Sequence, residues 1–236
     1  DNRLSSETLH NKLIEGILST GVNIVNIGLC TTPLFNFSAH SLDIPFGIMI
    51  TASHNPSHHN GFKIFGENFT HLEQEELQVF YNFIKNGTFS TGNGSVTESN
   101  LKEEYIQMLI SKAEVNPNLK VVIDTGNGTP SILIKEVFDK LFKNVIYLNE
   151  ISDGVFPVHN PDPNEPSNLQ ELINHVLELK ADIGLAFDGD GDRLGVVDEK
   201  GNIVPTDTLI GIYAENFIPK LNNKNVIIDV KCSAGL

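Results

Sequence analysis

The chain has 236 residues, of which 40 % are apolar and 19 % charged, a composition ordinary for a globular protein of one large domain or two smaller ones. Its formal net charge of −14 at pH 7 argues against nucleic acid or an anionic membrane as a partner. The sequence contains no apolar run of the ~18 residues that a membrane span needs, its first residues show no signal-peptide pattern, and its two cysteines do not suggest a disulfide framework. We therefore expect a cytoplasmic protein in which a cationic patch or a metal attracts any phosphorylated substrate.

In chain order, the first hundred residues alternate between helix and strand signals. The predicted elements are a helix with an apolar face at Leu9, Leu13, Ile14, Ile17 and Leu18, strands over residues 22–27, 47–50 and 62–65, and a helix carrying Leu72, Leu77, Phe80, Tyr81 and Ile84. A polar segment, residues 51–61, separates two of these strands. Residues 85–99 are rich in Gly, Ser, Thr and Asn, which predicts a domain boundary near residue 100.

The remaining residues repeat the alternation of strand and helix. The predicted elements are a helix with Tyr105, Met108 and Leu109, helices over 130–142, 169–179 and 208–217, and strands over 121–123, 145–148, 183–187, 194–197 and 226–230. This order indicates the α/β class. We expect a first domain over residues 1–100, a second over 101–202 and the beginning of a third over 203–236.

Three carboxylates stand at every second position between two apolar runs, at Asp188, Asp190 and Asp192. The intervening glycines let the backbone curl and turn all three toward one point. Carboxylates this close raise one another's pKa, so a cation is needed to keep them ionised. Hard oxygen ligands suit Mg²⁺ or Ca²⁺ better than Zn²⁺. This segment, residues 188–193, is called the aspartate loop below, and it predicts a divalent metal site.

Two other interpretations of the aspartate loop are less favoured. A solvated hairpin does not explain the regular spacing followed at once by Arg193. An EF-hand calcium loop that began at Asp188 would have Glu199 at position 12, as that loop requires. It would also have Arg193 at position 6, where glycine is required, and the flanking residues predict strands rather than helices.

A second chemical signal lies in residues 51–61, called the serine loop below. Ser53 follows an apolar strand, where α/β proteins place ligands, and His54 and Lys63 are near enough in sequence to converge on it. A serine hydroxyl is a weak nucleophile that needs a base, a metal or prior modification. The loop alone is also compatible with a plain polar turn. A Ser-His-Asp hydrolase is a weaker interpretation because the G-x-S-x-G turn is absent.

These motifs together resemble the α-D-phosphohexomutase superfamily over essentially the whole chain. The resemblance rests on T-A-S-H-N-P at 51–56, N-G-F-K at 60–63 and D-G-D-G-D-R at 188–193. H-N-P-D-P at 159–163 and D-V-K-C-S at 229–233 resemble the bacterial phosphomannomutase/phosphoglucomutase group more than the phosphoglucosamine mutases. The resemblance implies consecutive mixed-sheet α/β domains of the phosphohexomutase type.

The resemblance implies a metal site and a nucleophile at particular positions. Ser53 matches the serine that is phosphorylated in the active enzymes of this superfamily. Asp188, Asp190 and Asp192 match the ligands of Mg²⁺, and a phosphoserine oxygen of Ser53 would be a further ligand.

The resemblance also implies a reaction. His54 and Lys63 match residues that position the phosphoryl group and shuttle protons, and Arg193 matches an arginine close to the transferring group. Phospho-Ser53 would convert a hexose 1- or 6-phosphate of mannose or glucose into a hexose 1,6-bisphosphate and then take back the other phosphoryl group. The bisphosphate would also serve as activator and phosphoryl donor, and the partners would be small phosphosugars.

The chain departs from the superfamily in extent. Members have four domains and about twice this length, whereas this chain corresponds to most of domain 1, all of domain 2 and the opening of domain 3. The N-terminal strand and the loops that read the sugar and bind its phosphate have no counterpart. We expect the chain alone to fold at least partly and to bind metal, but to have little mutase turnover.

Other functions stay open at this point. Within the enzymes, the chain could belong to a phosphoglucosamine mutase, or to a metal-dependent phosphatase if water attacks the phosphoserine. From another class, it could be a non-catalytic metal-binding remnant. Two further features have weaker functional readings. The loop at 124–128 is more simply a structural turn between strand and helix than a phosphate cradle, and Arg3 resembles an arginine near the active-site entrance.

Overall fold

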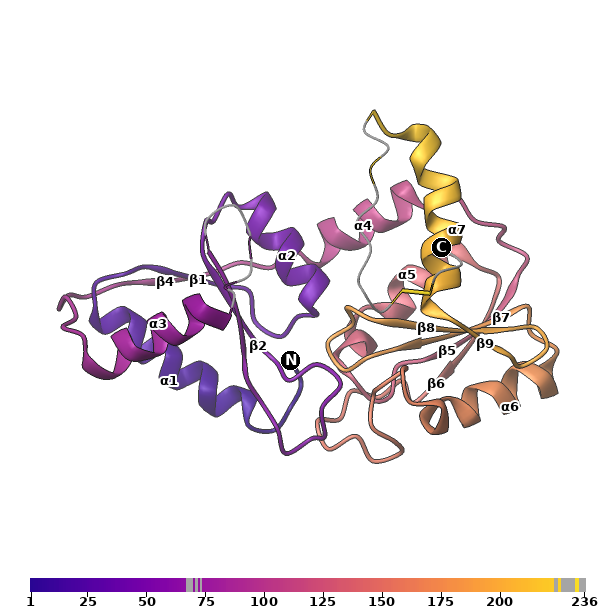
Figure 1. Ribbon diagram of the computed structural model, residues 1–236, viewed down its shortest axis with the longest axis horizontal. Coiled ribbons are helices and arrows are strands. Elements are labelled where there is room, and N and C mark those ends of the chain that lie inside the picture. Colours follow the sequence, from indigo (N-terminus) through magenta and orange to yellow (C-terminus); the bar gives the residue numbers. More distant parts are fainter. Residues whose placement is uncertain (67–69, 71, 73, 223–224, 226–231, 234–236) are drawn as a thin grey trace.

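The computed structural model describes residues 1–66, 70, 72, 74–222, 225 and 232–233. In its N-terminal part, helices lie around two small sheets (Figure 1). The parallel sheet pairs β1 (Ile24–Asn26) with β4 (Val96–Glu98), and the antiparallel sheet pairs β2 (Gly47–Ile50) with β3 (Phe62–Phe65). The helices are α1 (Ser6–Ser19), α2 (Thr32–Ser41) and α3 (Gln74–Asn86). The serine loop connects β2 to β3, so the antiparallel pair fixes both of its ends.

The larger sheet has the strand order β6-β5-β7-β8-β9. Its members are β5 (Lys120–Asp124), β6 (Asn144–Leu148), β7 (Ile183–Phe187), β8 (Leu194–Asp198) and β9 (Ile203–Val204). The central strand β5 is parallel to β6 and β7, whereas β8 is antiparallel to both of its neighbours. The aspartate loop is the turn between β7 and β8, at the end of the sheet where the parallel strands finish.

Helices cover both faces of this sheet, as Figure 1 shows. Successive side chains of a strand point to opposite faces, and Val122 of β5 belongs to one buried cluster with α6 (Gln170–Leu179). Its neighbours Val121 and Ile123 belong to another with α5 (Ile134–Leu141). All three valine and isoleucine side chains are fully buried. Among the described helices, none has the length and apolar character to cross a bilayer.

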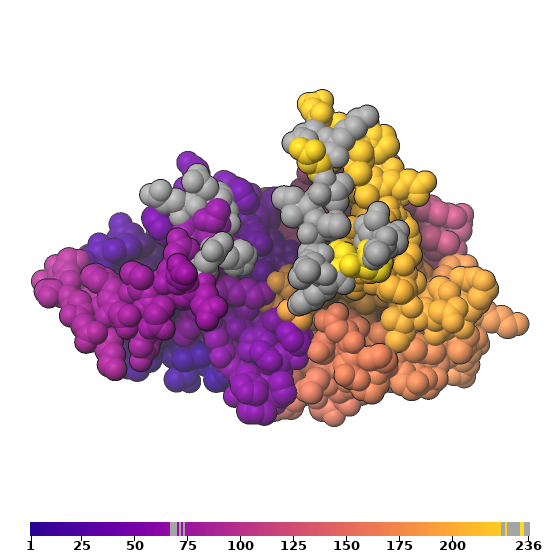
Figure 2. Space-filling model, in the orientation of Figure 1, coloured from indigo at the N-terminus to yellow at the C-terminus, as the bar shows by residue number. Residues whose placement is uncertain are grey.

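A third buried cluster joins the two parts of the chain. It contains Leu34 and Phe35 of α2, Tyr105 and Ile106 of α4 (Lys102–Lys112), and Val137 of α5. Figure 1 shows α4 between the N-terminal sheets and the larger sheet, and the two parts are in contact in the space-filling view (Figure 2). This packing brings the serine loop and the aspartate loop together.

Most predicted elements are present, with five differences. Leu72, predicted on a helix, precedes α3, and its N–H donates to the carbonyl of Ile64. Helix α2 and the short strands β4 and β9 were not predicted, and β4 lies within the segment interpreted as a turn-rich end of a domain. The helix predicted over 130–142 is divided into the 3-10 helix η2 (Thr129–Ile132) and α5, because Leu133 leaves helical backbone geometry. Helix α7 (Thr206–Phe217) matches a prediction; the remaining 3-10 helices are η3 (Pro166–Leu169) and η4 (Ile218–Lys220). The strand predicted over 226–230 lies outside the described residues.

Candidate active site

The aspartate loop places two carboxylates in the interior and one at its edge. Asp188 and Asp190 are fully buried, and the side chain of Asp192 is 33 % exposed. One carboxylate oxygen from each of the three lies within 4.8 Å of the others. Asp190 Oδ1 is buried, and no residue that the structure describes forms a hydrogen bond with it. An unpaired buried carboxylate oxygen is costly, so the donor set fits a divalent cation that prefers oxygen ligands.

The pKa values of the two buried aspartates are shifted in opposite directions, although both side chains are buried. Burial, and next the charge of Asp190, raise the pKa of Asp188 to about 7. Burial also opposes ionisation of Asp190, but hydrogen bonds from Lys63 and Thr32 outweigh it and lower the pKa of Asp190. Asp190 is therefore the ionised member of the pair, and Asp188 exchanges its proton near neutral pH.

The serine loop brings Ser53 directly onto the aspartate loop. Ser53 is buried and has a left-handed backbone conformation with φ of 52°, and its N–H donates to Thr51 Oγ1 at 2.8 Å. Its hydroxyl donates to Asp188 Oδ2 at 2.7 Å, across 135 residues of sequence. This strained backbone directs the predicted nucleophile toward the predicted metal ligands.

Cationic and polar side chains surround this contact. Lys63, on β3, bridges the cluster with ion pairs to Asp190 at 2.6 Å and Asp192 at 2.7 Å. Burial opposes the charge of Lys63, but these hydrogen bonds outweigh it and raise the pKa of the ammonium group. Lys63 thus supplies positive charge where a metal ion would also be held.

His54 and Arg193 complete the arrangement. His54 Nδ1 lies 3.4 Å from Ser53 Oγ, and Arg193 Nη1 donates to the same ring nitrogen at 2.6 Å. A guanidinium group can only donate, so Nδ1 of His54 accepts and carries no proton in this arrangement. The structure therefore brings together all seven site residues predicted from the sequence: Ser53, His54, Lys63, Asp188, Asp190, Asp192 and Arg193.

The sequence analysis did not predict Thr32 at the site, and for Arg3 it gave only a resemblance to an arginine near the active-site entrance. Thr32 Oγ1 donates to Asp190 Oδ2 at 2.6 Å, and Thr32 N–H donates to the carbonyl of Asp190. Arg3 lies beneath the serine loop rather than at an entrance, with a fully buried side chain. The signal for Thr32 was Thr31-Thr32-Pro33, a capping residue followed by proline, which marks the start of α2.

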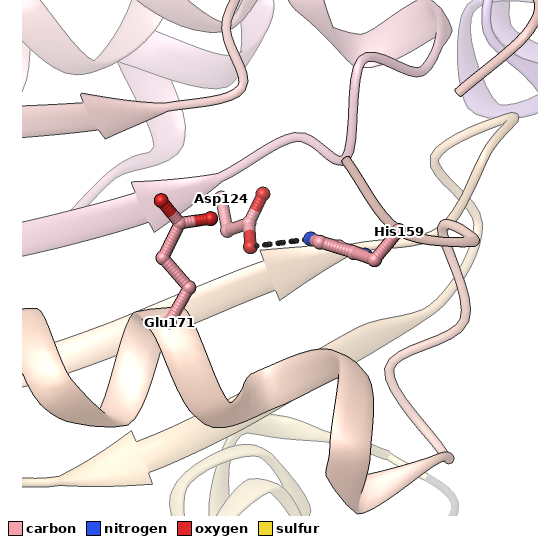
Figure 3. Close-up of side chains that lie close together, drawn as sticks. All are labelled: Asp124, His159 and Glu171. Carbon is pink, nitrogen blue, oxygen red and sulfur yellow. Dashed lines mark hydrogen bonds and ion pairs between the residues drawn. The ribbon is translucent and has the colours of Figure 1, made fainter. Parts of the chain in front are cut away.

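A second titratable cluster consists of Asp124 at the end of β5, His159 in the loop before η3 and Glu171 on α6 (Figure 3). Asp124 Oδ2 pairs with His159 Nε2 at 3.0 Å, and Glu171 lies beside them. The hydrogen bond that His159 donates to Asp124 raises the pKa of His159, although burial opposes its charge. The Nδ2 of Asn149 lies 3.0 Å from Asp124 Oδ1, 3.1 Å from Glu171 and 3.4 Å from His159. This amide already fills the centre of the cluster, so we interpret the cluster as structural.

Comparisons with known proteins identify the family to which the chain belongs. Residues 1–91 match the family model of phosphoglucomutase/phosphomannomutase alpha/beta/alpha domain I, and residues 103–201 match domain II. The chain belongs to the phosphoglucomutase/phosphomannomutase family. This result confirms the family and the α/β fold predicted from the sequence motifs.

Several members of the phosphoglucomutase/phosphomannomutase family are similar over almost the whole chain. A phosphomannomutase/phosphoglucomutase of Pseudomonas putida is 39 % identical over 236 residues, and a phosphoglucomutase of Neisseria meningitidis is 37 % identical over 233 residues. The crystal structure of a family protein from Burkholderia thailandensis has a TM-score of 0.86 and 33 % identity, covering 93 % of this chain and 49 % of that one. The chain spans 51 % and 50 % of the two curated relatives.

Proposed function

We propose that this chain provides the phosphoryl-transfer half of a phosphohexomutase that interconverts the 6-phosphates and 1-phosphates of mannose, glucose or both. The observation that carries the proposal is the 2.7 Å hydrogen bond from Ser53 Oγ to Asp188 beside two cationic side chains, Lys63 and Arg193. Phosphoryl transfer depends mainly on positioning and electrostatic stabilisation. The names of the relatives, phosphomannomutase/phosphoglucomutase and phosphoglucomutase, support the same reaction.

In the proposed site, Asp188, Asp190, Asp192 and an oxygen on Ser53 hold Mg²⁺. The bound ion would supply a fixed positive charge against the roughly two negative charges of phosphoserine. Arg193 offers planar, fork-like donors for the phosphoryl oxygens.

The proposed reaction consists of two balanced transfers. In the first, the bond between phosphorus and Ser53 Oγ breaks, a bond to the free hydroxyl oxygen of a hexose phosphate forms, and the proton of that hydroxyl passes to a base. The product is a hexose 1,6-bisphosphate. After it reorients, its other phosphoryl group returns to Ser53, and the proton is delivered to the leaving sugar oxygen.

Lys63 and His54 are the two candidates for the residue that carries this proton. His54 Nδ1 lies 3.4 Å from Ser53 Oγ, and it is free to accept a proton when Arg193 donates to the phosphoryl oxygens instead. Lys63 becomes available when a metal ion, rather than its ammonium group, neutralises Asp190 and Asp192. Separate His54→Gln and Lys63→Met variants distinguish them, because loss of the proton carrier changes the pH profile of turnover and not only its rate.

We propose small phosphosugars as substrates, hexose 1,6-bisphosphate as the donor that loads Ser53, and the cytoplasm as the compartment. Both cysteines, Cys30 and Cys232, are free thiols, as expected under reducing conditions. Burial raises the pKa of Cys30 to about 11, so its thiol stays protonated and unreactive.

The function is tested by measuring turnover of mannose 6-phosphate, glucose 6-phosphate and glucosamine 6-phosphate. We expect little turnover by the 236-residue chain alone, because it spans about half the length of the relatives. Full turnover by this chain would contradict that expectation. Turnover of glucosamine 6-phosphate alone, by a longer protein that contains the chain, would favour a phosphoglucosamine mutase instead.

A further inference from the structure

The guanidinium group of Arg3 lies beneath the serine loop, and all of its N–H groups form hydrogen bonds. A guanidinium group has five N–H donors, and each of the five has an acceptor here. Nε donates to Asp1 Oδ2 at 3.0 Å. The other four N–H groups donate to backbone carbonyl oxygens of the serine loop, those of Ser53, Asn55 and Pro56 at 2.7 Å each and that of His59 at 3.2 Å.

The environment of Arg3 keeps this geometry rigid. The side chains of Arg3 and Asp1 are both fully buried, and Asp1 Oδ2 also accepts from Thr51 Oγ1 at 2.8 Å. The ring of Phe156, from the other part of the chain, lies 5.0 Å from the guanidinium carbon. Arg3 therefore ties the start of the serine loop to its far end from below.

We propose that Arg3 is a positioning residue that holds the serine loop in the conformation in which Ser53 Oγ meets Asp188. The inference rests on the proposed function of Ser53. The carbonyl of Ser53 itself is one of the acceptors, and Ser53 has the left-handed φ of 52° that a serine does not adopt without support. Four carbonyl oxygens that converge on one planar cation fix the loop more closely than its own short turns can.

A lysine cannot replace this arrangement. Its ammonium group has three donors on a single atom, whereas the three nitrogens of Arg3 reach five acceptors around the edge of a planar group. Arg3→Lys keeps the charge and leaves at least two of the five acceptors without a donor. The loop should then open locally while the rest of the fold persists.

The experiment compares wild type, Arg3→Lys and Arg3→Ala, with Lys12→Ala as control because Lys12 is an exposed cation on the neighbouring helix. Amide hydrogen exchange reports the loop through the N–H groups of Asn55 and His59, which are hydrogen-bonded within it. We expect about tenfold faster exchange there in both Arg3 variants and no change in β5. We also expect the rate of Ser53 phosphorylation by glucose 1,6-bisphosphate with Mg²⁺ to fall about 100-fold in Arg3→Ala, at nearly unchanged KM.

Added guanidinium chloride, at a concentration that does not unfold the protein, should restore part of the rate in Arg3→Ala, and methylammonium chloride should not. Unchanged exchange and an unchanged phosphorylation rate in Arg3→Lys would overturn the inference. So would unfolding of both variants, because Arg3 would then support the domain as a whole. If wild type takes up no phosphate, either as this chain or within a longer protein that contains it, the proposed function fails and hydrogen exchange alone decides the role of Arg3.

Discussion

At the scale of single residues, the pKa values of two neighbouring carboxylates, Asp188 and Asp190, are shifted in opposite directions. Lys63 and Thr32 keep Asp190 ionised, while burial and the charge of Asp190 raise the pKa of Asp188 from 3.8 to about 7. A carboxylate whose pKa is raised by folding stabilises the folded state only while it is protonated. The metal-free protein should therefore lose stability as the pH rises from about 4 to about 7.

The same shift predicts a pH-dependent metal affinity. A proton on Asp188 competes with Mg²⁺, so the affinity should rise about tenfold per pH unit between pH 5 and 7 and level off above. Calorimetric titration with Mg²⁺ across this range measures it. An affinity independent of pH would contradict this account, because Asp188 would then either be ionised throughout or not be a ligand of the metal.

Lys63 provides a second test at this scale. Lys63→Met removes the cation between two carboxylates and should lower the free energy of unfolding without divalent metal by about 1–3 kcal/mol. Saturating Mg²⁺ should recover most of this loss, because the ion neutralises the same oxygens. Urea unfolding with EDTA or Mg²⁺ checks both parts, and Lys12→Met, at an exposed ion pair, is the control. If Mg²⁺ does not reduce the loss of stability, the ion does not neutralise the same carboxylate oxygens as Lys63.

At the scale of elements, the site depends on the close approach of two loops that belong to different sheets. A Cβ atom on Gly189 would lie 2.5 Å from the carbonyl oxygen of Ser53 and 3.2 Å from Pro161 Cγ. Real Cβ atoms do not approach a carbonyl oxygen this closely, so only glycine allows the contact. Pro161 follows His159, whose ion pair with Asp124 fixes this segment to β5. The cluster in Figure 3 thus acts on the candidate active site indirectly, because it fixes the segment whose Pro161 packs beside Gly189.

Gly189→Ala should therefore separate the loops. We expect a loss of about 100-fold in Ser53 phosphorylation, the effect of misplacing a reacting group by about 1 Å. Gly211→Ala is the matched control, since a Cβ there meets nothing within 4 Å and alanine favours the α7 helix. Equal phosphorylation rates in the two variants would show that the contact between the loops is not required.

At the scale of the whole molecule, the sequence predicted the chemistry more completely than the architecture. The aspartate loop and the serine loop carry dense local signals, because metal ligation and the turns around it need particular residues at fixed spacing. Contacts across long sequence distances left no such signal. Thr32 and Asp190 are 158 residues apart, and β4 is a three-residue strand whose only described pairing is with distant β1. Arg3 could not be assigned because its acceptors are backbone carbonyls, which every residue has.

The packing of the two parts of the chain brings the serine loop and the aspartate loop together into one site. The buried cluster shared by α2, α4 and α5 holds the N-terminal sheets against the larger sheet. Ser53 and Lys63 come from one side of this junction, and the aspartate loop comes from the other. The central claim is therefore that Ser53 accepts a phosphoryl group at this junction.

The most direct test is intact mass and phosphopeptide mapping of the purified protein before and after incubation with glucose 1,6-bisphosphate and Mg²⁺, with Ser53→Ala as control. The account predicts a gain of about 80 Da, one phosphoryl group, confined to the peptide that contains Ser53 and absent from the variant. Incorporation elsewhere, or equal incorporation by Ser53→Ala, would contradict it. So would the absence of incorporation both in this chain and in a longer protein that contains it.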